Sequence, residues 1–156
     1  MIGMSKIVKT IAGISFPFVM IYGLYVIVHG HLTPGGGFQG GAIVASGLAM
    51  ILVAYGSIWT MGKVKEKHLS VFESTGAFVF IFTAILGLLM AGVFFENFLS
   101  DGGIIFGNAA RAAGDMNTGG VIPIMNIAVG LKVIAGLFAI VLVMAFATTK
   151  MRGDSK

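Results

Sequence analysis

The sequence has no cysteine and few charged residues, and both absences limit what the protein can be. Without cysteine the chain forms no disulfide and no thiolate metal site, and three scattered histidines do not suit a zinc site closed by this chain alone. Charged residues make up 10% of the 156 residues, whereas about a quarter is usual in soluble domains. Hydrophobic residues make up 57%, which is more apolar surface than a soluble monomer could hide.

A long stretch without Lys, Arg, Asp or Glu extends from Thr10 to Gly62. It is too long for one buried core helix and long enough for two membrane crossings of about 20 residues each. Four apolar segments can each cross a bilayer, and they cover residues 7–28, 40–61, 72–95 and 121–149. We therefore expect an all-α membrane protein, with four transmembrane helices in a single membrane domain over residues 1–156.

Basic residues gather at the ends of these segments and predict their orientation. Arg111 lies alone on one side, in the 96–120 loop, and eight lie on the other: Lys6, Lys9, Lys63, Lys65, Lys67, Lys150, Arg152 and Lys156. Both termini are thus expected in the cytoplasm of a cell that carries this multi-pass protein in its cell membrane. Within the outer loop we expect a helical turn at 108–113 and an exposed pair of Arg111 with Asp115. Charges placed at span ends do not indicate nucleic-acid binding, despite the net charge of +4.

Glycine is abundant, with 24 residues, and several glycines recur four apart, as at Gly36 and Gly40 or Gly37 and Gly41. Small residues at this spacing let helices approach closely in lipid. The composition is typical of a chain that packs against other helices. We expect a subunit of a larger membrane complex.

The most distinctive motif reads HGHLTPGGGFQGG from His29 to Gly41 and joins the first two spans. As a tight turn, it would have Thr33 cap the next helix and Pro34 take its first position. As irregular backbone, its carbonyls would line an ion path. A phosphate-binding loop is disfavoured because the Lys-Ser/Thr that completes it is absent. The residues expected to serve packing are Pro34, Gly35, Gly36, Gly37, Phe38, Gly40 and Gly41.

This motif resembles the signature of the MnhB family, whose members are small membrane components of Mrp-type multisubunit sodium/proton antiporters. The same module is built into archaeal membrane-bound hydrogenases and sulfane reductase complexes. The resemblance implies a non-catalytic, cofactor-free subunit of a complex that exchanges sodium ions for protons. Its implied partners are other Mrp-type antiporter subunits, with hydrogenase or sulfane reductase subunits. Residues 119–132 are more similar to the hydrogenase-type module than to bacterial antiporter subunits, so we expect an energy-converting respiratory complex as the host.

Five side chains are candidates for an ion path, and three of them lie near the ends of predicted spans. His29 and His31 end the first span, where interfacial anchoring and proton relay are both open. Glu73 follows Ser70 by three residues, which predicts a capping box at the start of the third helix. The alternative is a carboxylate at which cations approach the membrane. The remaining two candidates are Asn126 and Lys132.

Lys132 is the only charge well inside a predicted span. A cation there costs at least about 2.5 kcal/mol, so we expect it to face a partner or water. Because Glu73 and Glu96 are expected at opposite membrane boundaries, its counter-ion is expected from another subunit. Two functions remain open: an ion-translocating subunit in which Lys132 and Asn126 line or gate a path, and a structural subunit that scaffolds the ion-moving subunits without lining a path.

Overall fold

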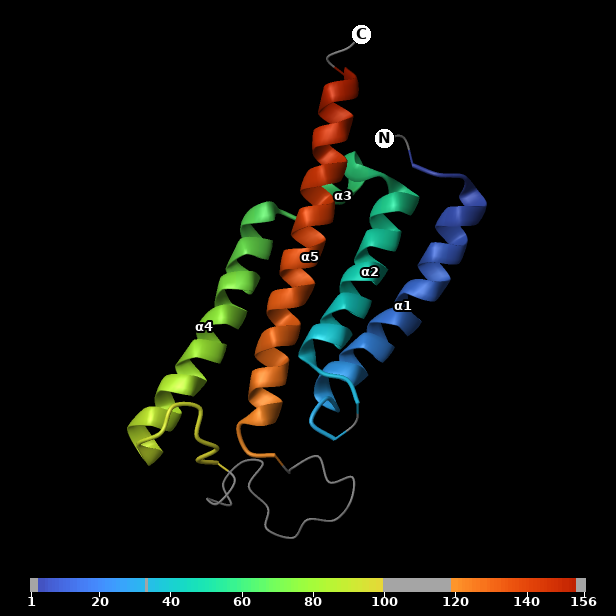
Figure 1. Cartoon of the computed structure of the whole chain (residues 1–156). Coiled ribbons are helices and arrows are strands. Elements are labelled where there is room, and N and C mark those ends of the chain that lie inside the picture. The colour runs from blue at the N-terminus through green and yellow to red at the C-terminus, as the bar shows by residue number, and fades with distance from the viewer. Residues whose placement is uncertain (1–2, 33, 100–118, 154–156) are drawn as a thin grey trace.

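The computed structural model describes residues 3–32, 34–99 and 119–153, which are helical apart from the connecting segments (Figure 1). No strand occurs within these ranges. Four helices in this part of the chain, α1, α2, α4 and α5, are long and apolar enough to cross a membrane. The helices are α1 (Lys6–Val28), α2 (Gly37–Tyr55), α3 (Ser57–Lys63), α4 (Glu66–Ala91) and α5 (Ile122–Gly153).

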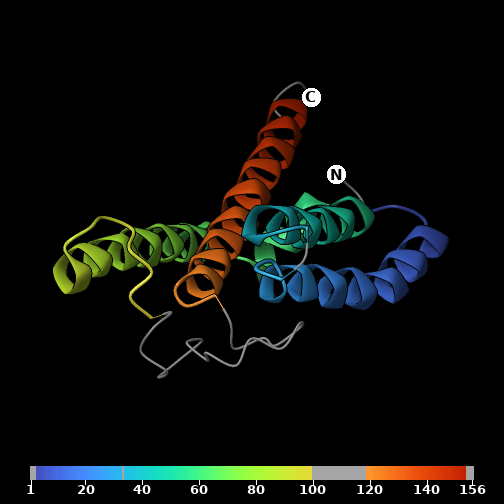
Figure 2. The ribbon, with the colours of Figure 1, turned by 60° about the horizontal axis from the view of Figure 1, so that its bottom comes forward.

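The four long helices run alternately up and down and lie side by side in the order α4, α5, α2, α1 (Figures 1 and 2). Helix α2 packs between α1 and α5, and α4 packs on α5 alone among the long helices. The start of α1, the short helix α3 and the end of α5 lie at one end of this row. The turn at residues 29–36 lies at the other end. The row is therefore open on both faces.

Small residues fill the contacts between the helices, while most large apolar side chains point out of the row. Ile7 is 72% exposed and Leu89 is 74% exposed. Lipid tails or apolar partner helices suit such surfaces, because neither needs polar groups from the protein. The buried alanines are Ala12, Ala45, Ala54, Ala84, Ala128 and Ala135. A cluster of larger buried side chains joins α2, α4 and α5, and consists of Leu52, Leu69, Phe138 and Leu142.

The second apolar segment is broken by Gly56. This residue has φ 92°, a conformation that suits glycine, and α2 ends just before it. Residues 57–63 form the separate helix α3, so the predicted continuous span 40–61 is interrupted. Ser57 is buried, and its hydroxyl lies 3.0 Å from the Thr149 hydroxyl. This hydrogen bond fastens α3 to the end of α5.

The third long helix begins at Glu66, six residues before the predicted start at residue 72. Its N-cap residue is Lys65, so Ser70 and Glu73 lie inside the helix and the capping-box prediction is wrong. The first turn of α4 is polar, and a helix can continue into the aqueous layer beyond the hydrocarbon. The helix ends at Ala91, where Gly92 has φ 78° and adopts the left-handed conformation.

The turn before α2 also differs from its prediction. Helix α2 begins at Gly37 with Gly36 at its N-cap, so Pro34 precedes the helix rather than opening it. The predicted cap, Thr33, lies outside the described residues. So do the predicted helical turn at 108–113 and the pair of Arg111 with Asp115.

Candidate functional site

Asn126 lies in the first turns of α5, against the glycines of the turn between α1 and α2. A methyl group added at Gly30 would come within 2.9 Å of the Asn126 Nδ2, and one added at Gly36 would lie 3.8 Å from its Oδ1. The side-chain amide therefore occupies space that other residues at these positions would fill. Its Nδ2 is buried and has no hydrogen-bond partner among the described residues.

Two histidines lie in the same region. The His29 ring stacks on the Tyr25 ring with centroids 4.1 Å apart, and the His29 backbone N–H donates to the Tyr25 carbonyl at 2.9 Å. A methyl group added at Gly119 would lie 3.3 Å from Cδ2 of His31, so the His31 ring covers the segment that leads into α5. Both ring nitrogens of His31 are buried, without a hydrogen-bond partner in the described ranges. We call His29, His31 and Asn126 the turn-end cluster.

Asn97 holds the start of α5 beneath this cluster, and sequence reasoning missed it. Its Oδ1 accepts a hydrogen bond from the Val121 N–H at 2.8 Å, and its Nδ2 donates to the Gly119 carbonyl at 3.2 Å. These bonds satisfy two backbone groups where the chain enters the helix. An Asn in a Gly-rich connection signals a turn. Nothing in the sequence links it to a segment more than 20 residues away.

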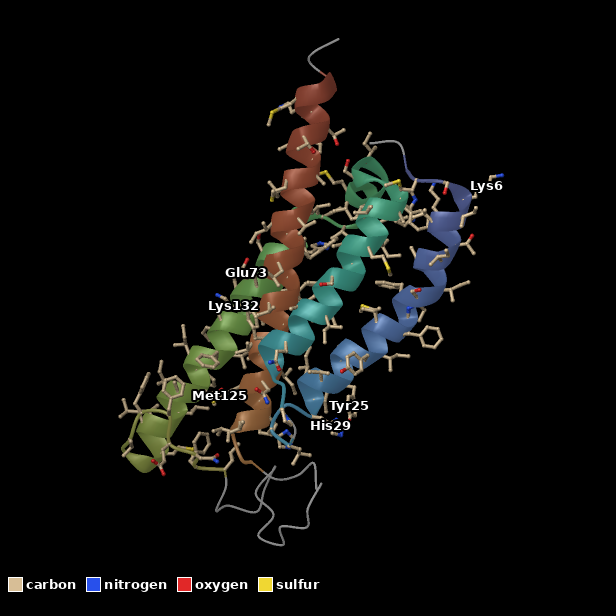
Figure 3. The ribbon with its side chains drawn as sticks, turned by 45° about the vertical axis from the view of Figure 1, so that its right-hand side comes forward. Lys6, Tyr25, His29, Glu73, Met125 and Lys132 are labelled. Atoms are coloured by element: carbon tan, nitrogen blue, oxygen red, sulfur yellow. The ribbon has the colours of Figure 1, made fainter. Side chains whose placement is uncertain are left out.

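The second polar site lies where α4 meets α5. A methyl group added at Gly76 would come within 2.6 Å of the Ala128 carbonyl oxygen and 2.9 Å of the Lys132 backbone nitrogen. The two backbones therefore touch at Gly76. A methyl group added at Gly136 would lie 3.5 Å from the carboxylate carbon of Glu73. We call Glu73 and Lys132 the α4–α5 pair (Figure 3).

The prediction that Lys132 finds no acidic group within the helices of its own chain is therefore wrong. Glu73 lies about two turns inside α4, within the part of the helix that can span the membrane. Its side chain is half-buried, whereas that of Lys132 is exposed on the surface of the row. The two side chains project from the same helix contact. The sequence could not show this, because the register of α4 on α5 is set by packing.

The five ion-path candidates thus fall in two places rather than one. Asn126 and Lys132 are six residues apart on α5, which separates them by about 9 Å along the helix axis. The structure brings Asn126 together with the turn between α1 and α2, and Lys132 together with Glu73. It does not bring the two histidines to the α4–α5 pair.

The glycines of the 29–41 motif serve two different helix contacts. A methyl group at Gly41 would lie 2.9 Å from the Gly130 carbonyl oxygen on α5, whereas one at Gly40 would lie 2.7 Å from the Gly23 carbonyl oxygen on α1. Gly37 also faces α5, at Asn126 and Gly130. The other motif members differ: Pro34 and Phe38 are exposed, and Phe38 is exposed to 61%.

These features define a multi-pass membrane protein that carries an acid and a base within its apolar helices. A family model for the domain related to the MnhB subunit of the Na+/H+ antiporter matches residues 7–139. The chain therefore belongs to this family, and the resemblance seen in the 29–41 motif is confirmed.

Two curated relatives and one solved structure are similar to the chain. An uncharacterized protein of Methanocaldococcus jannaschii is 35% identical over 136 residues, which is 85% of this chain and 49% of the relative. The B-type component of the Na(+)/H(+) antiporter of Bacillus subtilis is 33% identical over 73 residues, which is 47% of this chain and 43% of the relative. The chain therefore spans about half the length of these relatives or less.

The solved structure is that of the membrane-bound sulfane sulfur reductase, an archaeal respiratory membrane complex. One of its chains matches with a TM-score of 0.73 and 34% identity. The match covers 90% of this chain and 58% of that chain. The arrangement of the helices in a row is thus shared with a component of a respiratory membrane complex.

Proposed function

We propose that the chain is the MnhB-type membrane subunit of a multisubunit sodium/proton antiporter module in an energy-converting respiratory complex. The observation that carries this proposal is the match of 90% of the chain to a component of an archaeal respiratory complex. Its partners are then other antiporter-type subunits, with sulfane reductase or hydrogenase subunits in the same assembly. We assign electron transfer and catalysis to those other subunits.

Two features of the polar sites support a part in ion movement. Glu73 and Lys132 lie within helices that can span the membrane, and ionisable residues there mark ion or proton pathways far more often than they serve packing. Nearer the turn end of α5, the cluster supplies imidazole and amide groups, which bind water and can pass protons. Helix α5 carries residues of both sites and is their common element.

The second candidate function is a scaffold, and the open row of helices favours it. Both faces of the row expose large apolar side chains, and glycines create the close contacts within it. A flat element of this kind can fill the space between two larger subunits without moving ions. The scaffold needs no particular charge at residue 132, whereas the ion path does.

The exchange activity itself can be tested on the assembly isolated through an affinity tag on this chain. Reconstituted vesicles should acidify or alkalinise their lumen when a sodium gradient is imposed, and a potassium gradient of the same size should have a much smaller effect. A pH-sensitive dye inside the vesicles reports the movement. Equal responses to both cations, or no response beyond that of a protonophore-treated control, would count against the proposed function.

The orientation leads to a separate prediction. The chain lacks cysteine, so single cysteines introduced at Lys65 and Asn117 can each be labelled without interference. With both termini in the cytoplasm, an impermeant maleimide should label Asn117→Cys in intact cells and Lys65→Cys only after permeabilisation. Ser57→Cys is a useful control because Ser57 is only 1% exposed and should react slowly from either side. Labelling of Lys65→Cys in intact cells would reverse the proposed topology.

A further inference from the structure

The α4–α5 pair has a geometry that suits a cation site. We propose that the Glu73 carboxylate binds a monovalent cation, a proton or a sodium ion, and that the Lys132 ammonium competes with this cation for the carboxylate. The choice between the two cations rests on the proposed function. The competition itself rests on the positions of the two side chains.

The first step is the close approach of the helices. Gly76 brings α4 against the backbone of α5 at Ala128 and Lys132, with a methyl position only 2.6 Å from the Ala128 carbonyl oxygen. Gly136 leaves room for the Glu73 carboxylate, which lies 3.5 Å from its methyl position. A larger residue at either glycine would push the helices apart or displace the carboxylate.

The second step is the reach of the two side chains. Gly76 follows Glu73 by three residues and Gly136 follows Lys132 by four, so each glycine shares a helix face with the charged residue one turn before it. The methyl position of Gly76 lies 3.0 Å from the Cβ of Lys132. The charged side chains therefore begin about one helical turn apart. Rotation about the χ angles of two long side chains spans this distance.

The third step is the cost of leaving the carboxylate charged and alone. No salt bridge joins Glu73 to Lys132 in this structure, although both residues are described, and Glu73 is half-buried. In residues 69–91 of α4 and 122–149 of α5 there is no other charged residue. A partly buried carboxylate in this setting is neutralised by its single basic neighbour, by a proton or by a metal cation.

A fluorescent hydrophobic carbodiimide tests this competition, because it reacts with protonated carboxyl groups in an apolar setting. In membranes that contain the assembled complex, Glu73 should be labelled slowly in the parent. Lys132→Met should raise the labelling rate by about fivefold, the factor expected when a partly exposed partner charge is lost. Sodium chloride should slow the labelling more than potassium chloride does. Mass spectrometry of the labelled chain identifies the modified residue.

Three variants complete the design. Glu73→Gln should remove the label, Lys132→Arg should label as slowly as the parent, and Lys150→Met should not change the rate. The proposal is overturned if Glu73 stays unlabelled in Lys132→Met, or if Lys132→Arg and Lys150→Met react as fast as Lys132→Met. Labelling that responds to Lys132 but not to sodium identifies the proton as the bound cation. Because labelling needs no turnover, a complex without antiport activity would still give a clear answer.

Discussion

Replacing Gly37 with valine is expected to remove the chain from its assembled complex. A side chain at this position would overlap the Asn126 carbonyl oxygen and come within 2.9 Å of the Gly130 backbone nitrogen. Backbone atoms cannot rotate away, so we expect a cost at or above the upper end of the usual range for overpacking, that is about 3 kcal/mol. Immunoblots should show less than about a tenth of the parent amount in the purified complex.

The matched control is Gly13→Val, the same change within a different long helix. The nearest atom to a methyl group at Gly13 is the Tyr55 hydroxyl oxygen, at 3.9 Å, so this variant should assemble. Reduced assembly of both variants to the same degree would show that valine harms the helices and not the contact of α2 with α5. Normal assembly of Gly37→Val with lost ion transport would instead assign the turn a direct role in lining the ion path.

Lys132→Met is expected to leave the complex assembled but to impair coupled movement of sodium and protons. Methionine fills a similar apolar volume, and the exposed position of residue 132 leaves room for it. Loss of a group that handles protons should lower the sodium-dependent proton flux on the order of tenfold or more. The flux is measured in vesicles that hold equal amounts of intact mutant and parent complex.

Lys150→Met is the matched control, because it removes a lysine from the same helix outside the α4–α5 pair. Its flux should stay close to that of the parent. A flux from Lys132→Met that equals the parent's would reject the ionic role and support the scaffold. A flux lost equally in both variants would show that the net charge of α5 matters and not the position of Lys132.

The apolar segments and the 29–41 motif made the four long helices and the family predictable. Length and hydropathy report which residues can lie in lipid, and the motif is long enough to be specific. The ends of the helices were less predictable. Polar residues 66–71 lie outside the apolar segment yet continue α4, since a helix does not stop at the edge of the hydrocarbon. Gly56 interrupts an apolar run, and hydropathy does not register a glycine with positive φ.

The candidate site was predicted as single residues and not as pairs. Lys132 stood out because its charge lies in an apolar run, and the small residues around it indicated that a helix approaches there. That helix is α4 of the same chain, which brings Glu73 to the contact through Gly76. The pairing depends on the register of two helices more than 50 residues apart in the sequence. A local pattern does not contain this information, and the same reason hid the contact of Asn97 with Gly119.

The identity of the proteins that copurify with this chain tests its assignment as an antiporter-type subunit most directly. The chain should be tagged at its natural expression level and isolated from native membranes in a mild detergent, and its partners identified by mass spectrometry. We predict larger antiporter-like subunits together with hydrogenase or sulfane reductase subunits, all lost together in Gly37→Val. A chain that elutes alone or as a homo-oligomer, in a preparation where other membrane complexes stay intact, would contradict the account.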